Sequence, residues 1–410
     1  MATKKSPAEL STEECLSRLS KKYSGYTPDE FVKTGLLSVD IVLGGKGIPM
    51  GKLIDVSSES GLGKSTLLLH IAKSLCDQGH KCVWIDSECA LSDSILNGID
   101  NANNAPVGPL MKYKDEGMFE IFTVSSYAAV EEILDMLMPQ GDFKFYFIDS
   151  LTNITSEAFL KSTVYDKDAK SVDSVTVAED ARVQSKFMKK VKVFAKQYMA
   201  TIFFVSQQRT YINMGYGGKP SGAVRAGGKA IKYNMDGMID IINLGEIKEK
   251  KTTLNGEEEI KVGRNIALYI QEKCRFGPGN VKVPAVIYYG KGYSNASTLR
   301  RFMETKQVAD GNKLAPMLSN SGRSYTIRLG DEKIKLDGGN AVKEYIKENF
   351  DKILSFFDAS DFALVQEDFN EALQNSTADS LGDDFDVVID GEPVNDDEFD
   401  SGDDFEVTID

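Results

Sequence analysis

A glycine-rich run that ends in lysine and serine, at residues 58–65, has the residue types of a phosphate-binding loop. Gly61 and Gly63 let backbone N–H groups turn toward phosphate oxygens, and the helix expected next presents its N-terminus to an anion. Lys64 would neutralise the β- and γ-phosphates, and Ser65 would bind Mg²⁺. The usual pattern has glycine where this chain has Ser58. The sequence predicts a nucleoside triphosphate site made of Ser58, Glu59, Ser60, Gly61, Leu62, Gly63, Lys64, Ser65 and Thr66.

Two apolar, strand-like segments end in carboxylates that suit the same site. Asp149 follows residues 145–148, where an acid would hold or orient the metal. Asp86 and Glu88 follow residues 83–85. A carboxylate beside the γ-phosphate can orient the attacking water, because proteins promote phosphoryl transfer mainly by positioning and electrostatic stabilisation. The residues alone leave the choice between Asp86 and Glu88 open.

Residues 207–232 contain five basic residues, six glycines, two tyrosines and no acid. A mobile loop of this composition suits a phosphate backbone and unstacked bases, although many basic glycine-rich loops are merely solvated. Residues 160–176, where three lysines are mixed with three aspartates, are a weaker candidate for a second DNA loop. The candidate DNA-binding residues are Arg209, Tyr211, Tyr216, Lys219, Arg225, Gly227, Gly228 and Lys229.

Short apolar segments alternate with helical ones, which indicates parallel strands joined by helical crossovers. The later strands follow one another closely and should add antiparallel pairs at one edge. The fold class is therefore α/β with a mostly parallel central sheet. Strands are expected at 53–56, 82–86, 120–124, 145–149, 201–206, 238–244, 266–271 and 285–289, and helices at 36–43, 66–76, 128–138 and 178–198.

Four segments are expected along the 410 residues. A helical arm occupies 1–28, and the α/β core occupies 29–300. A small α+β lobe at 301–374 contains a hairpin and a helix from residue 340 to 350. An acidic tail at 375–410 should be disordered when free. The tail contains one short peptide twice, as Gly-Asp-Asp-Phe-Asp-Val-Val-Ile-Asp at 382–390 and Gly-Asp-Asp-Phe-Glu-Val-Thr-Ile-Asp at 402–410.

The net charge of −14 is concentrated near the C-terminus. Residues 353–410 hold 19 of the 62 acidic residues and none of the 48 basic ones, so residues 1–352 carry a net charge of +5. Such asymmetry is typical of proteins that act on nucleic acid. The tail either keeps the protein soluble, competes with DNA for the basic segment, or docks on a partner.

The remaining composition excludes several classes of protein. No segment approaches the roughly 18 apolar residues of a membrane span, and no export signal follows Met1. A cytoplasmic protein with no membrane partner is therefore expected. The five cysteines show no close ligand pairs and predict neither a disulfide framework nor a zinc site.

Taken in order, the motifs resemble those of the RecA family of DNA strand-exchange recombinases, including its phage members of the UvsX type. The likeness covers roughly residues 30–300 and, more loosely, the segment up to 350. Chance does not place so many short motifs in the same order. They are Thr34-Gly35-Leu36-Leu37-Ser38-Val39-Asp40, Gly47-Ile48-Pro49-Met50-Gly51-Lys52, Ile85-Asp86-Ser87-Glu88, Ile148-Asp149-Ser150, Ser206-Gln207-Gln208-Arg209 and Gly227-Gly228-Lys229-Ala230-Ile231-Lys232-Tyr233.

The resemblance implies a RecA-type P-loop ATPase core that uses ATP and Mg²⁺ and is stimulated by DNA. Glu88 would be the catalytic carboxylate, Gln207 would sense the γ-phosphate, and Lys273 and Arg275 would reach the ATP of a neighbouring subunit. The arm at 1–28 would pack on that neighbour and give a helical filament on single-stranded DNA, which pairs with double-stranded DNA and exchanges strands. Single-strand-binding and mediator proteins are the accessory partners to expect.

The chain departs from the family pattern at two further places. Bacterial members have two lysines, one residue apart, at the contact with the neighbour's ATP, where this chain has Gln271 and Lys273. The run 272–275 is closer to the phage pattern. A phage-encoded protein would act in the cytoplasm of the host cell. Ile95 stands where the family has an aromatic residue near the adenine.

Two other functions would use the same nucleotide residues. A hexameric helicase with a RecA core would also have them, but residues 36–40, the turn at 49–51 and the basic segment match recombinases better. A recombination regulator that does not hydrolyse ATP would not need the complete set of Lys64, Ser65, Asp149 and Glu88. The sequence therefore favours a DNA-dependent ATPase that exchanges strands.

Overall fold

The computed structural model describes residues 30–361, apart from 99–108, 163–173, 212–221, 226–227, 254–255, 271–272, 278 and 359–360, together with residues 11, 13, 14, 17 and 386–388. Most of the expected arm at 1–28 and most of the expected tail at 375–410 lie outside these residues. None of the described helices is long and apolar enough to cross a membrane.

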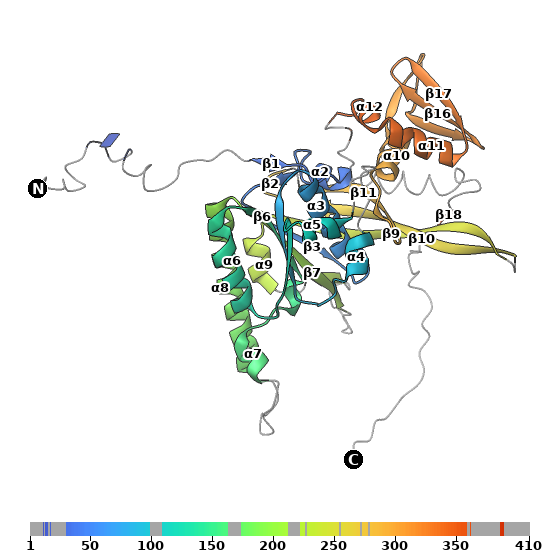
Figure 1. Cartoon of the computed structure of the whole chain (residues 1–410). Coiled ribbons are helices and arrows are strands. Elements are labelled where there is room, and N and C mark those ends of the chain that lie inside the picture. Colours follow the sequence, from blue (N-terminus) through green and yellow to red (C-terminus); the bar gives the residue numbers. More distant parts are fainter. Residues whose placement is uncertain are drawn as a thin grey trace, which may run out of the picture.

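A mixed sheet forms the centre of the molecule (Figure 1). Its main path runs β12-β11-β10-β9-β3-β7-β6-β4-β5 among the described residues. The strands from β9 to β5 on this path are parallel to their neighbours, and those from β9 to β12 are antiparallel. The strands are β3 (Leu53–Ser58), β4 (Lys81–Asp86), β5 (Phe119–Thr123), β6 (Phe143–Asp149), β7 (Thr201–Tyr211), β9 (Gly237–Thr253), β10 (Gly256–Ile270), β11 (Val281–Tyr288) and β12 (Gly292–Tyr293).

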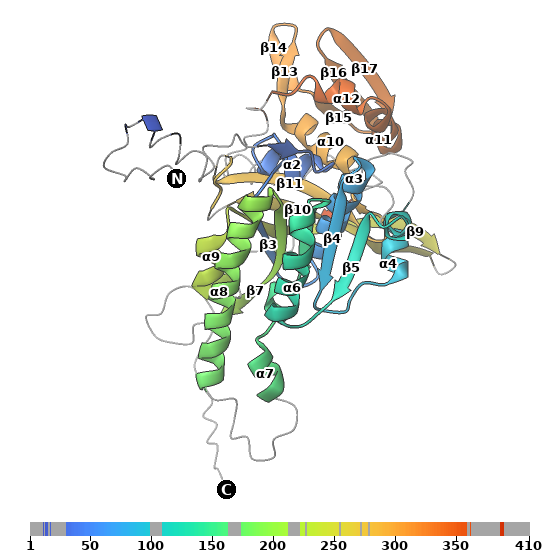
Figure 2. The ribbon, with the colours of Figure 1, turned by 60° about the vertical axis from the view of Figure 1, so that its left-hand side comes forward.

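The two faces of the sheet bury alternate residues of the same strands, as expected for a parallel sheet covered on both sides. On β4, Cys82 and Trp84 pack into one hydrophobic cluster, whereas Val83 and Ile85 pack into another. The first cluster lies against α2 (Leu37–Val42) and α3 (Lys64–Asp77), and the second against α6 (Tyr127–Leu137), α8 (Ser174–Tyr198) and α9 (Gly228–Asn234) (Figures 1 and 2). The prediction of helical crossovers on a mostly parallel sheet is confirmed.

A third hydrophobic cluster belongs to the smaller α+β region that follows the sheet. It joins α10 (Asn295–Thr305) and α11 (Gly339–Glu348) to β15 (Leu318–Ser321), β16 (Ser324–Leu329) and β17 (Glu332–Asp337). The expected hairpin is β16–β17, and the expected helix is α11. Also here are β13 (Gln307–Asp310), β14 (Lys313–Pro316) and α12 (Phe350–Leu354).

The strands β9 and β10 are much longer than the apolar runs 238–244 and 266–271 that predicted them. Their outer halves pair as a long antiparallel ribbon that extends away from the core (Figure 1). The register sets Lys250 opposite Glu259 and Lys251 opposite Glu258. The sequence at 248–261 is rich in Lys and Glu, so a search for apolar residues does not find this ribbon.

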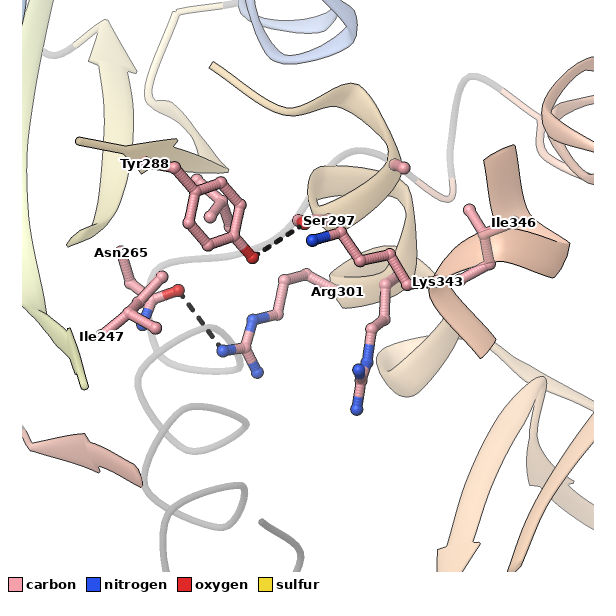
Figure 3. Close-up of a pocket in the computed structure, with 10 residues that line it drawn as sticks. Ile247, Asn265, Tyr288, Ser297, Arg301, Lys343 and Ile346 are labelled. Atoms are coloured by element: carbon pink, nitrogen blue, oxygen red, sulfur yellow. Dashed lines mark hydrogen bonds between the residues drawn. The ribbon is translucent and has the colours of Figure 1, made fainter. Parts of the chain in front are cut away.

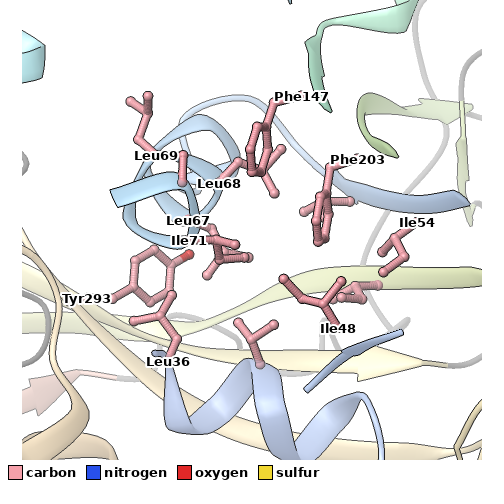
Figure 4. Packing of buried hydrophobic residues seen from close by; sticks show 14 of the residues in the cluster. Leu36, Ile48, Ile54, Leu67, Leu68, Leu69, Ile71, Phe147, Phe203 and Tyr293 are labelled. Carbon is pink, nitrogen blue, oxygen red and sulfur yellow. The ribbon is translucent and has the colours of Figure 1, made fainter. Parts of the chain in front are cut away.

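The aromatic stack at the centre of the first cluster gives a test of the core. Phe147 is fully buried, and its ring stacks on Trp84 with a centroid distance of 5.6 Å and on Phe203 with one of 5.2 Å (Figure 4). We expect Phe147→Ala to lower the free energy of unfolding by about 3–5 kcal/mol, because it leaves a cavity where the ring contacted Trp84 and Phe203. The exposed Met136→Ala is the control, with a change below about 0.5 kcal/mol. Urea denaturation measures both, and equal values would contradict this packing.

Candidate functional site

The phosphate-binding loop lies between the end of β3 and the start of α3. Both of its glycines are in the left-handed region, with φ of 76° at Gly61 and 84° at Gly63, and Gly63 directly precedes the first residue of the helix. A Cβ atom at Gly63 would come within 2.7 Å of Ile287 Cδ1. The loop therefore needs glycine at Gly63 both for its backbone angle and for its close approach to β11.

The departure at Ser58 has a role in this loop. The Nζ atom of Lys64 donates to Ser58 Oγ at 3.1 Å, to the Ser58 carbonyl at 3.3 Å and to the Glu59 carbonyl at 2.8 Å. The Ser58 hydroxyl in turn donates to the Glu59 carbonyl at 2.6 Å. Burial lowers the pKa of Lys64, and the charges of Asp149 and Glu88 raise it. The oxygens of Ser58 and Glu59 therefore replace part of the water that the buried ammonium group has lost. Ser58 supplies a ligand for Lys64 that glycine would lack.

Asp86 and Glu88 take different positions after β4. The carboxylate of Asp86 accepts the backbone N–H of Glu88 at 3.0 Å and that of Leu91 at 3.1 Å, so it fixes the loop after the strand. Glu88 accepts the hydroxyl of Ser150 at 2.6 Å and lines the cavity beside the phosphate loop. The geometry favours Glu88 as the group that faces a nucleotide, and Asp86 as its support.

Asp149 ends β6 beside Asp86, its partner in the parallel register. The pKa of Asp149 is raised to about 6, mainly by burial and also by the charges of Glu88 and Asp86, against a hydrogen bond from Ser65 and the charge of Lys64. A cation would relieve this cost. Among the described residues no group of three His, Cys, Asp or Glu side chains could hold a metal. One carboxylate and one hydroxyl fit Mg²⁺, which keeps waters and substrate phosphates as its other ligands.

Residues 60–66 of the phosphate loop, Glu88 and Asp149 line one cavity of about 560 Å³, a size typical of small-molecule sites. Gln207 reaches it from β7, where it pairs in register with Ser58. The half-exposed Ile95, on the short helix α4 (Asp93–Gly98), lies in the wall, and its place near the base stays a prediction. The lining consists of Ser60, Gly61, Leu62, Gly63, Lys64, Ser65, Thr66, Glu88, Ser94, Ile95, Gly98, Asp149, Val205, Gln207, Arg264, Ile287, Tyr288, Tyr289, Gly290 and Gly292.

The wall formed by β10 and β11 was missed from the sequence. Arg264 Nε donates to the hydroxyl of Tyr289 at 2.7 Å, and Tyr289 is 45% exposed. An exposed aromatic ring at the edge of this cavity offers a flat apolar surface to a base, and the adjacent guanidinium offers a positive charge. The signal in the sequence was the pair of tyrosines before Gly290 at the end of an apolar run, but nothing local connected it with the phosphate loop.

A buried contact ties β12 to the phosphate loop. The backbone N–H of Tyr293 donates to His70 Nε2 at 3.3 Å, and the Tyr293 hydroxyl donates to the Gly63 carbonyl at 3.3 Å. Burial and the charge of Lys73 lower the pKa of His70 to about 4, so His70 is neutral and can accept this bond at neutral pH. The hydrogen bond from Tyr293 thus attaches β12 to the phosphate loop at Gly63.

The predicted mobile loop at 207–232 is wrong over much of its length. β7 continues to Tyr211 and pairs antiparallel with β8 (Gly222–Arg225), and α9 begins at Gly228. Arg209 and Tyr211 therefore lie in one strand and Arg225 in its partner, whereas Lys229 lies in a helix. The β-forming residues of 208–211 extend the strand beyond its apolar core, which composition alone does not reveal. Tyr216, Lys219 and Gly227 lie outside the described residues, as does most of 160–176.

Lys273 and Arg275 lie away from the cavity, at the C-terminal end of α9. The ammonium of Lys273 donates to the carbonyls of Lys232 and Tyr233, each at 3.0 Å, and Arg275 pairs with Asp236 at 3.0 Å. Lys273 thus caps helix carbonyls. Neither residue lines the nucleotide cavity of its own chain, so a contact with ATP would require a neighbouring subunit, and that role stays a prediction.

A model of the RecA N-terminal domain matches residues 13–274. The chain belongs to the RecA family. It is 24% identical to the protein RecA of Rickettsia bellii over 83% of this chain and 89% of that protein, and 26% identical to the protein RecA of Brucella anthropi over 78% and 76%. It is also 26% identical to the protein RecA of Ruegeria pomeroyi over 78% and 79%. The chain is thus a RecA-like recombination protein by distant homology, in a family that binds ATP, and these relatives give no support to a phage origin.

The raised pKa of Asp149 predicts that ionisation of this carboxyl group lowers the stability of this RecA-family chain when no metal is bound. The pKa is about 6 against an ordinary 3.8, so ionisation costs stability as pH rises from about 4 to 6, and the full cost remains above pH 6. Without nucleotide or metal, Asp149→Asn should raise the free energy of unfolding at pH 8 by on the order of 1–3 kcal/mol, and the gain should vanish near pH 4.

Urea denaturation at pH 8 and pH 4 measures this difference. The exposed Asp331→Asn in the β16–β17 turn is the matched control, and it should give no pH-dependent gain. An Asp149→Asn protein no more stable than the parent at pH 8 would show that the buried carboxylate carries no such cost.

Proposed function

We propose that this RecA-family protein is an ATP-dependent recombinase that assembles as a helical filament on single-stranded DNA, pairs it with duplex DNA and exchanges strands. The observation that carries the proposal is the position of Gln207. It lines the nucleotide cavity, and the same strand continues through Arg209 and Tyr211 into the basic segment. A shift of Gln207 on a γ-phosphate would therefore be transmitted along one rigid strand to the residues proposed to contact DNA.

Lys64, Glu88 and Asp149 would each have a distinct task in hydrolysis. The backbone N–H groups of the phosphate loop would bind the phosphates, and Lys64 would leave its loop oxygens to neutralise the β- and γ-phosphates. Glu88, oriented by Ser150, would position the attacking water. Mg²⁺, held through Ser65 and Asp149, would neutralise charge on the phosphate oxygens. Tyr289 and Ile95 would lie on the base.

Assembly would complete the site. Lys273 and Arg275 carry positive charge outside their own cavity, and we propose that they approach the ATP of the adjacent subunit, with the arm at 1–28 providing the contact between subunits. The DNA-binding set would be Arg209, Tyr211, Tyr216, Lys219, Arg225, Gly227, Gly228 and Lys229, and the protein would act in the cytoplasm with single-strand-binding or mediator proteins.

ATP turnover with and without single-stranded DNA tests this function. The parent protein should hydrolyse ATP faster when single-stranded DNA is added. Lys64→Ala should lower turnover by at least about 100-fold, because a phosphate charge is left without its cation. The exposed Lys313→Ala in β14 is the control for loss of one surface lysine and should keep full turnover.

Two outcomes would point elsewhere. An ATPase that is indifferent to single-stranded DNA would contradict a recombinase. Electron microscopy with single-stranded DNA and a slowly hydrolysed ATP analogue should show helical filaments, whereas closed rings together with unwinding activity would identify a hexameric helicase.

A further inference from the structure

Among the described strands of the central sheet, few pair with one edge of β9. β10 pairs with one edge over residues 240–253, whereas on the opposite edge β3 pairs only with residues 237–240. An open edge of this kind is a template for a further strand. Part of it is filled by the C-terminal segment of the same chain, where β18 (Asp386–Val388) pairs antiparallel with residues 246–248 (Figure 1).

The register of this added pair suits an acidic, β-forming peptide. Asp386 is opposite Lys248, Val387 is opposite Ile247, and Val388 is opposite Glu246. At these register positions the sequence has an acid against a base and a β-branched residue against another, with no two like charges paired. The pair adds main-chain hydrogen bonds to β9.

Ile247 also lines a cavity of about 40 Å³ between the sheet and the α+β region. Two cations in its wall, Arg300 and Arg301, are paired with Glu304 at 2.9 and 3.2 Å. Figure 3 shows Arg301 directed at Asn265, at 3.3 Å. The cavity has room for water but not for a nucleotide. It is therefore not a small-molecule site, and the docked strand is held by its pairing with β9.

The docked strand belongs to the first copy of the peptide that the tail contains twice. The copies at 382–390 and 402–410 agree at seven of nine positions, and in the second copy Glu406, Val407 and Thr408 stand at the positions of β18. Each replacement keeps the acid or the β-branched side chain. The second copy lies 20 residues further along the chain than the first, so the segment that leads to it is longer than the one that already lets the first copy reach the edge.

We propose that the edge of β9 at residues 246–248 is a docking site for the chain's own acidic peptide, and that the two copies are interchangeable occupants. While one copy is docked, the other is left for the same edge of a second chain. The proposal concerns neither ATP nor DNA and is independent of the recombinase function.

A full-length variant with both copies disabled gives the test. Neighbouring residues of a strand direct their N–H groups to opposite edges, so proline at both Val387 and Val388, and at both Val407 and Thr408, removes a bond from either copy. A fluorescent synthetic peptide of residues 402–410 should bind this four-proline protein at least about tenfold more tightly than the parent, whose edge is occupied within the chain. Fluorescence anisotropy measures both affinities.

Three controls make the outcome decisive. The same peptide with Val407→Pro and Thr408→Pro should not bind, and binding would show that charge alone holds it. Proline in the first copy only should leave the parent's weak apparent affinity, because the second copy takes its place; tight binding there would refute interchangeability. Hydrogen exchange of residues 246–248 should be faster in the four-proline protein. Equal peptide affinity and equal exchange in parent and four-proline protein would overturn the proposal.

Discussion

The parallel register of β3, β7, β6 and β4 is the constraint on which the functional site depends. It sets Ser58 beside Gln207 and Asp149 beside Asp86, so that the ends of four strands meet at one edge of the sheet. Because the carboxyl ends of parallel strands share an edge, residues separated by about 150 positions, such as Ser58 and Gln207, lie together there. A slip of one residue in this register would turn the functional side chains away from the cavity.

The charges that this register gathers are unfavourable in the absence of a ligand. Burial and the neighbouring acids raise the pKa of Asp149, and burial lowers that of Lys64. The protein tolerates them through local contacts, since Lys64 rests on the oxygens of Ser58 and Glu59 while Glu88 rests on Ser150. A nucleotide with its metal would replace these contacts with complementary charges. Binding is thereby favoured at some expense of stability, as is common in functional sites.

Much of the fold and the centre of the site could be predicted from the sequence, because the signals there are local. The buried strands are apolar runs, and each of β3 to β7 begins within two residues of its expected start. The phosphate loop is a contiguous motif. Other features depend on pairing between distant segments. The ribbon of β9 and β10 is polar, the strand through Arg209 continues without apolar residues, and Arg264 with Tyr289 reaches the cavity only through the antiparallel edge.

We propose that Gln207 couples the nucleotide cavity to a DNA-binding segment through β7. The most direct measurement is the affinity for a labelled single-stranded oligonucleotide with a slowly hydrolysed ATP analogue and with ADP, in the parent protein and in Gln207→Ala. We expect the parent to bind DNA more tightly with the analogue than with ADP, and the variant to lose most of that difference while it still binds the analogue. Equal DNA affinity of the parent in the two nucleotide states would contradict the account.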